Sequence, residues 1–175
     1  RAETALRFDP DAIVINSFSK YFSMTGWRIG WMVLPANCVE TVERLAQNFY
    51  ISPPTISQVA ALASMDAGEE LEGHVQRYGR NRRVLLGALE KAGYDIVAPA
   101  EGAFYLYART AHLGLGSELF SKRLLAETGV AATPGTDFDP IDGQSWIRFS
   151  YAGSEADIAA ASELLVAWSR SLRQS

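Results

Sequence analysis

The stretch Ser17-Phe18-Ser19-Lys20 follows an apolar run and precedes Thr-Gly-Trp-Arg-Ile-Gly at residues 25–30. The run at residues 12–15 is rich in β-branched side chains, which is typical of a strand buried on both faces, as in a parallel sheet. Residues 27–34 predict a second buried strand. Lys20 is therefore expected at the end of a rigid strand.

The composition is that of a globular protein. The chain has 175 residues, 48% of them hydrophobic and 21% charged, with a net charge of −4, so broad nucleic-acid binding is not favoured. Cys38 is the single cysteine, and His74 and His112 are too isolated to suggest a metal site. Neither a membrane-spanning run nor a signal peptide is visible, which fits a cytoplasmic protein that does not bind membranes.

The order of elements predicts two parts. Residues 1–68 have the pattern of the end of a parallel α/β domain, and residues 69–175 that of an α+β unit. Asn37, and either Thr55 or Ser57, are candidate helix N-caps. We expect helices over 37–49, 55–63, 69–92, 117–127 and 154–172, and extended segments over 94–98, 104–108, 129–132 and 146–151.

Two simpler interpretations of the lysine exist. Ser17-x-x-Lys20 matches the serine–lysine pair of penicillin-recognising acyl enzymes, but those also need a Lys-Thr-Gly strand. None of Lys20, Lys91 and Lys122 is followed by Thr-Gly. A strand-end lysine without a role would leave the Gly-x-Arg-x-Gly pattern around Arg28 unexplained.

An aldehyde cofactor that carries a phosphate explains the whole set. A lysine fixed at a strand end can act as the amine nucleophile. Arg28 offers a phosphate a planar, permanently charged partner, and Ser17 offers a hydroxyl donor. Gly26 and Gly30 would leave room where the backbone passes close to a ligand or a neighbouring strand.

Five sequence blocks together resemble the aminotransferase class I/II family, the fold-type I enzymes that use pyridoxal 5'-phosphate (PLP). Beside the lysine block these are Pro53-Pro54-x-x-Ser57-Gln58-x-Ala60, Glu101-Gly102-Ala103-Phe104-Tyr105, Pro134-Gly135-x-x-Phe138 and Trp146-Ile147-Arg148-Phe149-Ser150, in the family's order. The resemblance implies an α/β fold in which residues 1–68 end the large parallel-sheet, cofactor-binding domain. Residues 69–175 would form the small C-terminal α+β domain, which begins with the bridging helix.

The resemblance also implies roles for individual residues. Lys20 would form the internal Schiff base with PLP. Ser17 and Arg28, with Ser19 as a weaker candidate, would hold the cofactor phosphate. Arg148 would bind the α-carboxylate of the substrate.

Arg148 has an independent physical argument. An arginine in an otherwise apolar strand needs an anionic partner or exposure to solvent. A structural ion pair with Asp137, Asp139 or Asp142 is the alternative to a substrate carboxylate.

The implied activity is the transfer of an amino group between an L-amino acid and a 2-oxo acid by a homodimer. A PLP-dependent β-lyase and the aminotransferase-like effector domain of a PLP-sensing transcription regulator share these blocks and are the alternatives. Dicarboxylate-specific relatives place an arginine near the position of Gln47, where the nearest arginine is Arg44. A neutral or aromatic amino acid is therefore expected rather than aspartate.

Part of the family's site lies upstream of its lysine. The acid that pairs with the pyridine nitrogen and the tyrosine near the phenolic oxygen come well before it, and Lys20 has only nineteen residues before it. The chain also begins with Arg1 rather than Met. We therefore expect these residues to belong to a longer protein and not to form a competent enzyme alone.

Overall fold

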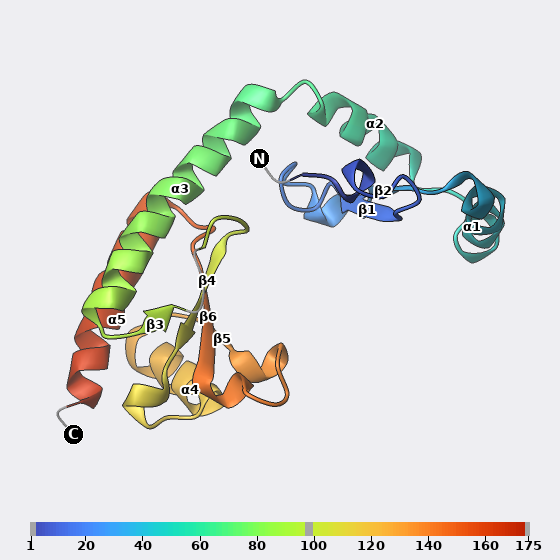
Figure 1. Ribbon diagram of the computed structural model, residues 1–175. Coiled ribbons are helices and arrows are strands. Elements are labelled where there is room, and N and C mark those ends of the chain that lie inside the picture. Colours follow the sequence, from blue (N-terminus) through green and yellow to red (C-terminus); the bar gives the residue numbers. More distant parts are fainter. Residues whose placement is uncertain (1–2, 97–99, 174–175) are drawn as a thin grey trace. The chain divides into compact units, whose positions relative to one another are not determined.

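The computed structural model describes residues 3–96 and 100–173. It divides into unit 1, residues 1–75, and unit 2, residues 76–175. The long helix α3 begins in one unit and ends in the other (Figure 1). Unit 1 holds η1 (Ala5–Arg7), β1 (Val14–Ser17), η2 (Thr25–Trp27), β2 (Gly30–Val33), α1 (Ala36–Phe49), α2 (Thr55–Ser64) and the start of α3 (Gly68–Lys91).

Strands β1 and β2 form an antiparallel pair in which Val14 is opposite Val33 and Ser17 is opposite Gly30. The prediction that both strands are buried on two faces is wrong for this chain. Ile15 is 75% exposed and Met32 is 46% exposed. The physical reason is that the pair forms a two-stranded sheet, and burial on both faces requires layers of other elements that these strands do not have among the described residues.

A small apolar cluster lies where the two strands are connected. Phe18, Met24 and Ala61 are its buried members, and Phe22 and Ile29 pack against them. Helix α2 thereby covers the segment that follows β1. This cluster fixes the backbone on both sides of Lys20.

Helices α1 and α2 begin after prolines. Pro35 and Pro54 are the N-cap residues, so the prediction that Asn37, Thr55 or Ser57 caps a helix is wrong. A proline suits this position because it lacks an N–H that would need a partner and has a fixed φ. Every residue of α1 is at least partly exposed.

Helix α3 matches its prediction closely. Glu69 and Glu70 lie in its first turn and Lys91 in its last, the charge order that a helix dipole favours. Gly93 follows with a φ of +79°, which confirms the predicted left-handed stop.

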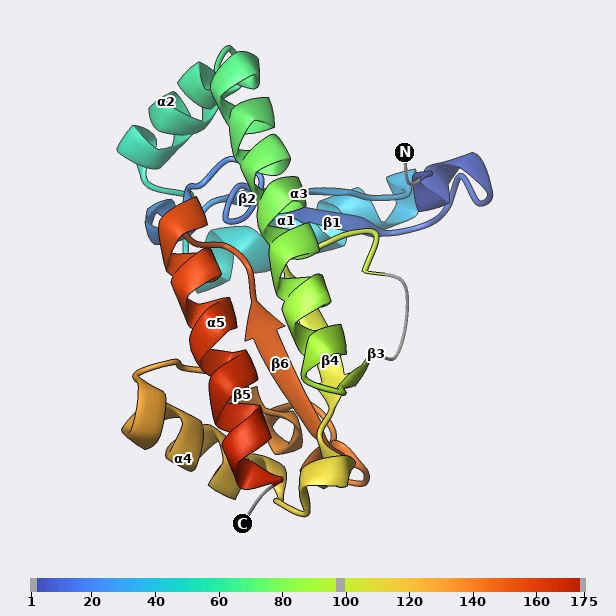
Figure 2. The ribbon, with the colours of Figure 1, turned by 90° about the vertical axis from the view of Figure 1, so that its left-hand side faces the viewer.

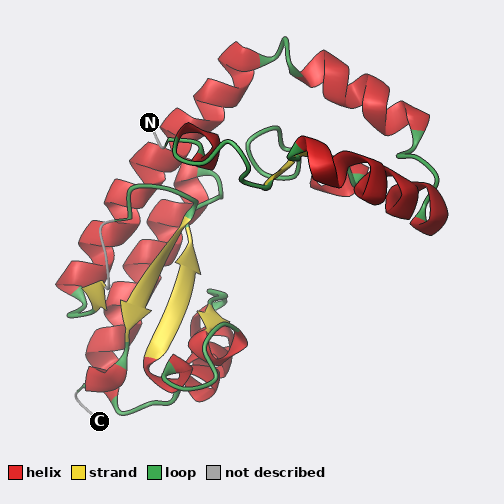
Figure 3. Cartoon of the chain, turned by 45° about the vertical axis from the view of Figure 1, so that its right-hand side comes forward, coloured by secondary structure: helices red, strands yellow, loops and turns green. Residues whose placement is uncertain are grey.

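Unit 2 contains a four-stranded antiparallel sheet with the order β3-β4-β6-β5. Figure 3 shows β4 and β6 as its long central strands. Residues 97–99 lie outside the described residues, and they include 97 and 98, the end of the segment predicted as strand 94–98. The elements are β3 (Asp95–Ile96), β4 (Tyr105–Arg109), η3 (Ala111–Leu113), α4 (Ser117–Thr128), β5 (Thr133–Pro134), η4 (Gly135–Asp137), η5 (Gly143–Ser145), β6 (Trp146–Ser150) and α5 (Glu155–Leu172).

The core of unit 2 lies between this sheet and its helices. Figure 2 shows α5 running alongside the second half of α3. The two strands alternate, so Leu106 and Ala108 of β4 and Ile147 and Phe149 of β6 point into the core. The helices contribute Leu85, Leu89, Phe120, Leu124, Leu165 and Trp168. The intervening residues of β4 and β6 are left on the opposite face, where Arg148 lies.

Candidate active site

The lysine block forms a tight turn directly after β1. The Ser17 hydroxyl donates to Ser19 Oγ at 2.9 Å, and the Ser19 backbone N–H donates to Ser17 Oγ at 3.0 Å. The Lys20 carbonyl accepts the N–H of Ser23 at 3.0 Å. Two hydroxyl groups and the exposed Lys20 are therefore held within one turn of backbone.

Phe18 fixes this turn to the rest of unit 1. Its N–H donates to the Ile29 carbonyl at 3.2 Å, and its carbonyl accepts the N–H of Met24 at 3.1 Å. Its ring lies 4.7 Å from that of Phe22, centre to centre. Because Phe18 is buried and paired on both backbone groups, the backbone just before Lys20 is held in place. Lys20 itself lies three residues beyond the end of β1 rather than at the end of the strand.

Arg28 is joined to the same turn. Its Nη1 donates to the Thr25 carbonyl at 2.8 Å, and the Thr25 hydroxyl donates to the Ser19 carbonyl at 2.6 Å. Among the described residues, the Arg28 guanidinium forms no salt bridge. Arg28 also has a φ of +51°, a left-handed conformation that costs on the order of 1–3 kcal/mol for residues other than glycine and is often found at functional sites.

The two glycines of the block differ. A Cβ on Gly30 would lie 2.5 Å from the Asn16 carbonyl oxygen on the neighbouring strand, so the predicted close approach is confirmed there. A Cβ on Gly26 would meet no described atom within 4 Å. Among the described residues, no close contact requires a glycine at position 26.

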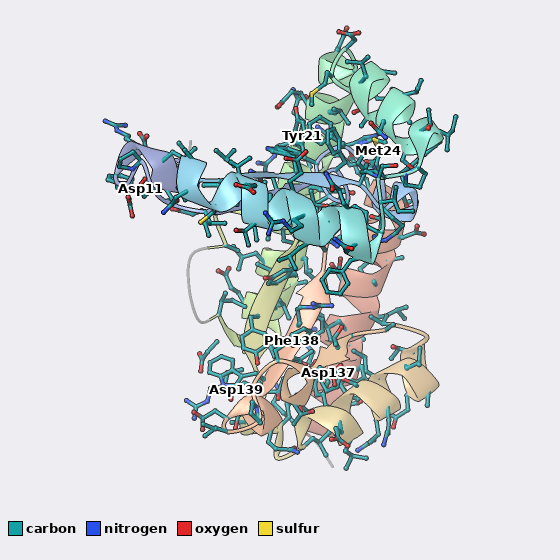
Figure 4. The ribbon with its side chains drawn as sticks, turned by 90° about the vertical axis from the view of Figure 1, so that its right-hand side faces the viewer. Asp11, Tyr21, Met24, Asp137, Phe138 and Asp139 are labelled. Carbon is teal, nitrogen blue, oxygen red and sulfur yellow. The ribbon has the colours of Figure 1, made fainter. Side chains whose placement is uncertain are left out.

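Two side-chain contacts connect the lysine turn to the first turns of α3. The Tyr21 hydroxyl donates to Glu72 Oε1 at 2.8 Å, and Ser23 Oγ lies 3.4 Å from His74 Nδ1 (Figure 4 labels Tyr21). The sequence did not indicate these pairs, because their partners are 51 residues apart. They join the turn to α3 in addition to its connection with β1.

Arg148 lies in unit 2, on the face of the sheet that points away from the core. In the register it stands between Tyr107 of β4 and Thr133 of β5. Its Nη2 donates to Thr133 Oγ1 at 3.3 Å, a long bond, and it forms no salt bridge among residues 3–96 and 100–173. The alternative of a structural ion pair with a nearby aspartate is not supported.

The three aspartates considered for that ion pair have other surroundings. Asp139 Oδ1 accepts the N–H groups of Ile141 at 2.8 Å and Asp142 at 3.1 Å. Asp137 and Asp142 lie in the same loop, and within the described ranges neither forms a hydrogen bond or salt bridge with Arg148. Asp139 thus stabilises its own loop, and among the described residues none of the three aspartates forms a salt bridge with Arg148.

Aromatic groups surround Arg148 in place of carboxylates. Its guanidinium carbon lies 4.4 Å from the ring centre of Phe138 and 5.4 Å from that of Tyr105. The Tyr107 hydroxyl is buried with no hydrogen-bond partner in the described part of the chain, and burial, followed by the Asp139 charge, raises its pKa. Sequence reasoning missed Phe138 and Tyr105 as neighbours of Arg148, although both lie in blocks that it had singled out.

The predicted site residues therefore fall into two sets. Ser17, Ser19, Lys20 and Arg28 lie together on one connection in unit 1, and Arg148 lies in unit 2. No group of three or more His, Cys, Asp or Glu side chains that could hold a metal ion occurs in the described ranges. Nor does any helix described there have the length and hydrophobicity needed to cross a bilayer.

Known proteins are similar to this chain in both sequence and fold. Valine–pyruvate aminotransferase of Mycobacterium tuberculosis is 44% identical over 160 residues, which is 90% of this chain and 41% of that protein. The (5-formylfuran-3-yl)methyl phosphate transaminase of Methanocaldococcus jannaschii is 37% identical over 160 residues, 89% of this chain and 42% of that protein. The chain thus spans well under half the length of these curated relatives.

A crystal structure of an aminotransferase from Mycobacterium tuberculosis superposes with a TM-score of 0.94 at 42% identity, covering 98% of this chain and 45% of that one. This agreement confirms the predicted fold class, the later part of a fold-type I enzyme. The model of the family "Aminotransferase class I and II" matches residues 3–165. The chain therefore belongs to the class I and II aminotransferase family.

Proposed function

We propose that this chain supplies the cofactor lysine and the carboxylate-binding arginine of a PLP-dependent aminotransferase. The observation that carries the proposal is that Lys20 and Arg28 lie on the connection between β1 and β2 and are linked by hydrogen bonds. Arg28 donates to the Thr25 carbonyl, and the Thr25 hydroxyl donates to the carbonyl of Ser19, the residue before Lys20. An amine nucleophile and an arginine without a carboxylate partner in the described chain are the two groups that an aldehyde bearing a phosphate requires.

The donors present suit the phosphate of such a cofactor. Ser17 and Ser19 each carry a hydroxyl, and the Arg28 guanidinium uses one N–H on Thr25 and has others to offer. Ser17, Ser19 and Arg28 would hold the phosphate, and Lys20 would bond to the aldehyde carbon. When bound, PLP supplies the electron sink that stabilises negative charge on the substrate Cα.

The chain's own residues would then bind the substrate and move its proton. Arg148 would accept the α-carboxylate and orient the amino acid. Once the amino group of the substrate has taken its place on the aldehyde carbon, the Lys20 amine would take the proton from the substrate Cα as a general base and deliver it to that former aldehyde carbon. The product of the first half is a 2-oxo acid, and a second 2-oxo acid would accept the amino group.

The substrates proposed are a neutral L-amino acid and a 2-oxo acid. Arg44, the arginine nearest to the family's dicarboxylate position, pairs with Glu40 at 2.6 Å on the exposed side of α1. The name of the valine–pyruvate relative also favours an uncharged side chain. The names of the valine–pyruvate aminotransferase and of the furanylmethyl phosphate transaminase favour amino transfer as the function, rather than that of a β-lyase or of a regulator's effector domain.

The wider organisation is also a proposal. Residues 1–68 would complete the large cofactor-binding domain, and residues 69–175 would form the small domain that begins with the bridging helix α3. Family membership supports a homodimer, and we place the enzyme in the cytoplasm. Because the chain spans 41% of the valine–pyruvate relative, we do not expect it to sustain transamination by itself.

The three lysines allow a decisive test. In the enzyme that carries this chain, borohydride reduction in the presence of PLP should leave a covalent adduct on Lys20, found by peptide mass spectrometry. Lys20→Ala should abolish the adduct and the cofactor's visible absorption band, whereas Lys91→Ala and Lys122→Ala should keep both. An adduct that persists in Lys20→Ala would overturn the proposal.

A further inference from the structure

The face of the unit 2 sheet that carries Arg148 is built differently from the core face. Tyr107, Arg148 and Thr133 form one cross-strand row over β4, β6 and β5. Tyr105 lies on the same face of β4, two residues from Tyr107. An arginine is thus placed among ring and hydroxyl groups on a rigid antiparallel surface.

Aromatic rings make the close contacts to the Arg148 guanidinium. The ring centre of Phe138 is 4.4 Å away and that of Tyr105 is 5.4 Å away, both within the range of a cation–π contact. Tyr105 comes from β4 on one side of β6, and Phe138 follows β5 on the other. The hydrogen bond from this guanidinium to Thr133, at 3.3 Å, is too long to fix its orientation alone.

The loop that carries Phe138 is itself fixed. The N–H groups of Phe138 and Asp139 both donate to the Gly135 carbonyl at 2.9 Å. A Cβ on Gly135 would lie 2.4 Å from the Gly143 carbonyl oxygen, so only glycine lets the two loop segments approach this closely. Figure 4 shows Phe138 between Asp137 and Asp139 on this loop.

Core burial does not account for the position of Phe138, because 51% of its surface is exposed. A guanidinium is planar, and its N–H groups point outward in that plane. Because the two rings contact the guanidinium without accepting its hydrogen bonds, its N–H groups stay available to a carboxylate. These contacts also restrict the rotation of a long side chain before the substrate arrives.

We propose that Phe138 is a positioning residue for Arg148, assisted by Tyr105. This inference rests on the proposed role of Arg148 as the ligand of the substrate α-carboxylate. Phe138 holds the guanidinium in an orientation that is ready for bidentate binding. Removing its ring therefore weakens carboxylate binding without changing the proton transfer at the substrate Cα.

The test uses steady-state kinetics of the enzyme that carries this chain. Phe138→Ala should raise KM for the amino acid about two- to fivefold with kcat nearly unchanged, the effect of losing one exposed cation–π contact. Phe138→Tyr should restore KM because it keeps the ring. Leu119→Ala, at a position of α4 that is also 51% exposed, should leave both constants unchanged.

Two comparisons separate this inference from the proposed function. With an amine substrate that lacks the carboxylate, Phe138→Ala and the parent enzyme should react equally, which a general structural defect would not allow. Arg148→Gln should raise KM for the amino acid far more than Phe138→Ala. An unchanged KM in Arg148→Gln would overturn the role of Arg148. A raised KM there with an unchanged KM in Phe138→Ala would overturn the positioning role alone.

Discussion

The hydroxyl of Tyr94 lies 2.6 Å from Ser169 Oγ in the core of unit 2. Ser169 Oγ also donates to the Leu165 carbonyl at 2.8 Å, so its own hydrogen is in use and Tyr94 must be the donor. Burial raises the pKa of Tyr94 from 10.0 to about 12, while the charge of Arg173 opposes that rise. The folded state therefore favours the protonated phenol.

This pKa predicts a loss of stability in alkaline solution. The contribution of Tyr94 is complete below pH 10, its unfolded value, and is lost as the pH rises through about 12. The difference corresponds to roughly 3 kcal/mol of unfolding free energy. Tyr94→Phe should be less stable at neutral pH by about 1 kcal/mol, the value of one hydrogen bond, but should show a flatter alkaline decline.

Denaturant unfolding of the chain across this pH range measures both effects. Tyr50→Phe, at an exposed position, serves as the control and should keep the parent decline. An identical alkaline slope in Tyr94→Phe and the parent chain would show that another group causes the decline.

A second prediction concerns Asn81, which is almost fully buried on α3. Its Nδ2 donates to the carbonyls of Tyr151 and Gly153, each at 3.0 Å, directly after the strand that carries Arg148. Asn81→Ala leaves two carbonyls without their donor and should lower the free energy of unfolding by about 2–4 kcal/mol. Asn48→Ala, which removes one bond on the exposed helix α1, should cost much less; equal losses would argue against the role of burial.

A third prediction contrasts the glycines of the lysine block. Gly30→Ala places its Cβ against the Asn16 carbonyl oxygen and should weaken the β1–β2 pairing, seen as faster amide hydrogen exchange at Phe18. Gly26→Ala should leave exchange unchanged because its Cβ meets open space. Equal effects of the two substitutions would contradict this assignment of the close approach.

A fourth prediction concerns the start of α5. Ser154 Oγ accepts the N–H of Asp157 at 3.0 Å and donates to Asp157 Oδ2 at 2.7 Å, which confirms the N-terminal cap expected from the sequence. Ser154→Ala should cost about 0.5–2 kcal/mol of unfolding free energy, and Ser154→Thr should keep most of it. Thermal unfolding followed by circular dichroism distinguishes the two variants. A loss of unfolding free energy in Ser154→Thr as large as that in Ser154→Ala would argue that the hydroxyl does not cap the helix.

Sequence periodicity predicted the helices well because their signals are local. The apolar spacing, the end charges and Gly93 all bear on α3 within its own length, and Ser154 lies three residues from its partner. Burial of residues 12–15 could not be predicted in the same way. An apolar run indicates that a strand can be buried, but its burial depends on which neighbours are present.

The candidate site shows the same limit. The spacing of Lys20 and Arg28 was visible because both belong to one short connection. The proximity of Phe138 to Arg148 depends on the pairing of β5 with β6 and on the tight Gly135–Gly143 approach. Those are register and close-contact properties, which no residue pattern encodes by itself.

In concentrated solution, we expect the two-stranded sheet of unit 1 to be a point of self-association. Each of β1 and β2 has one backbone edge that pairs with no other described strand, and Ile15 and Met32 add exposed apolar surface. Such an edge is a template for a strand from another molecule. Kept as a separate polypeptide, this chain should form β-rich aggregates in proportion to its concentration, and charged substitutions on these two strands should improve its solubility.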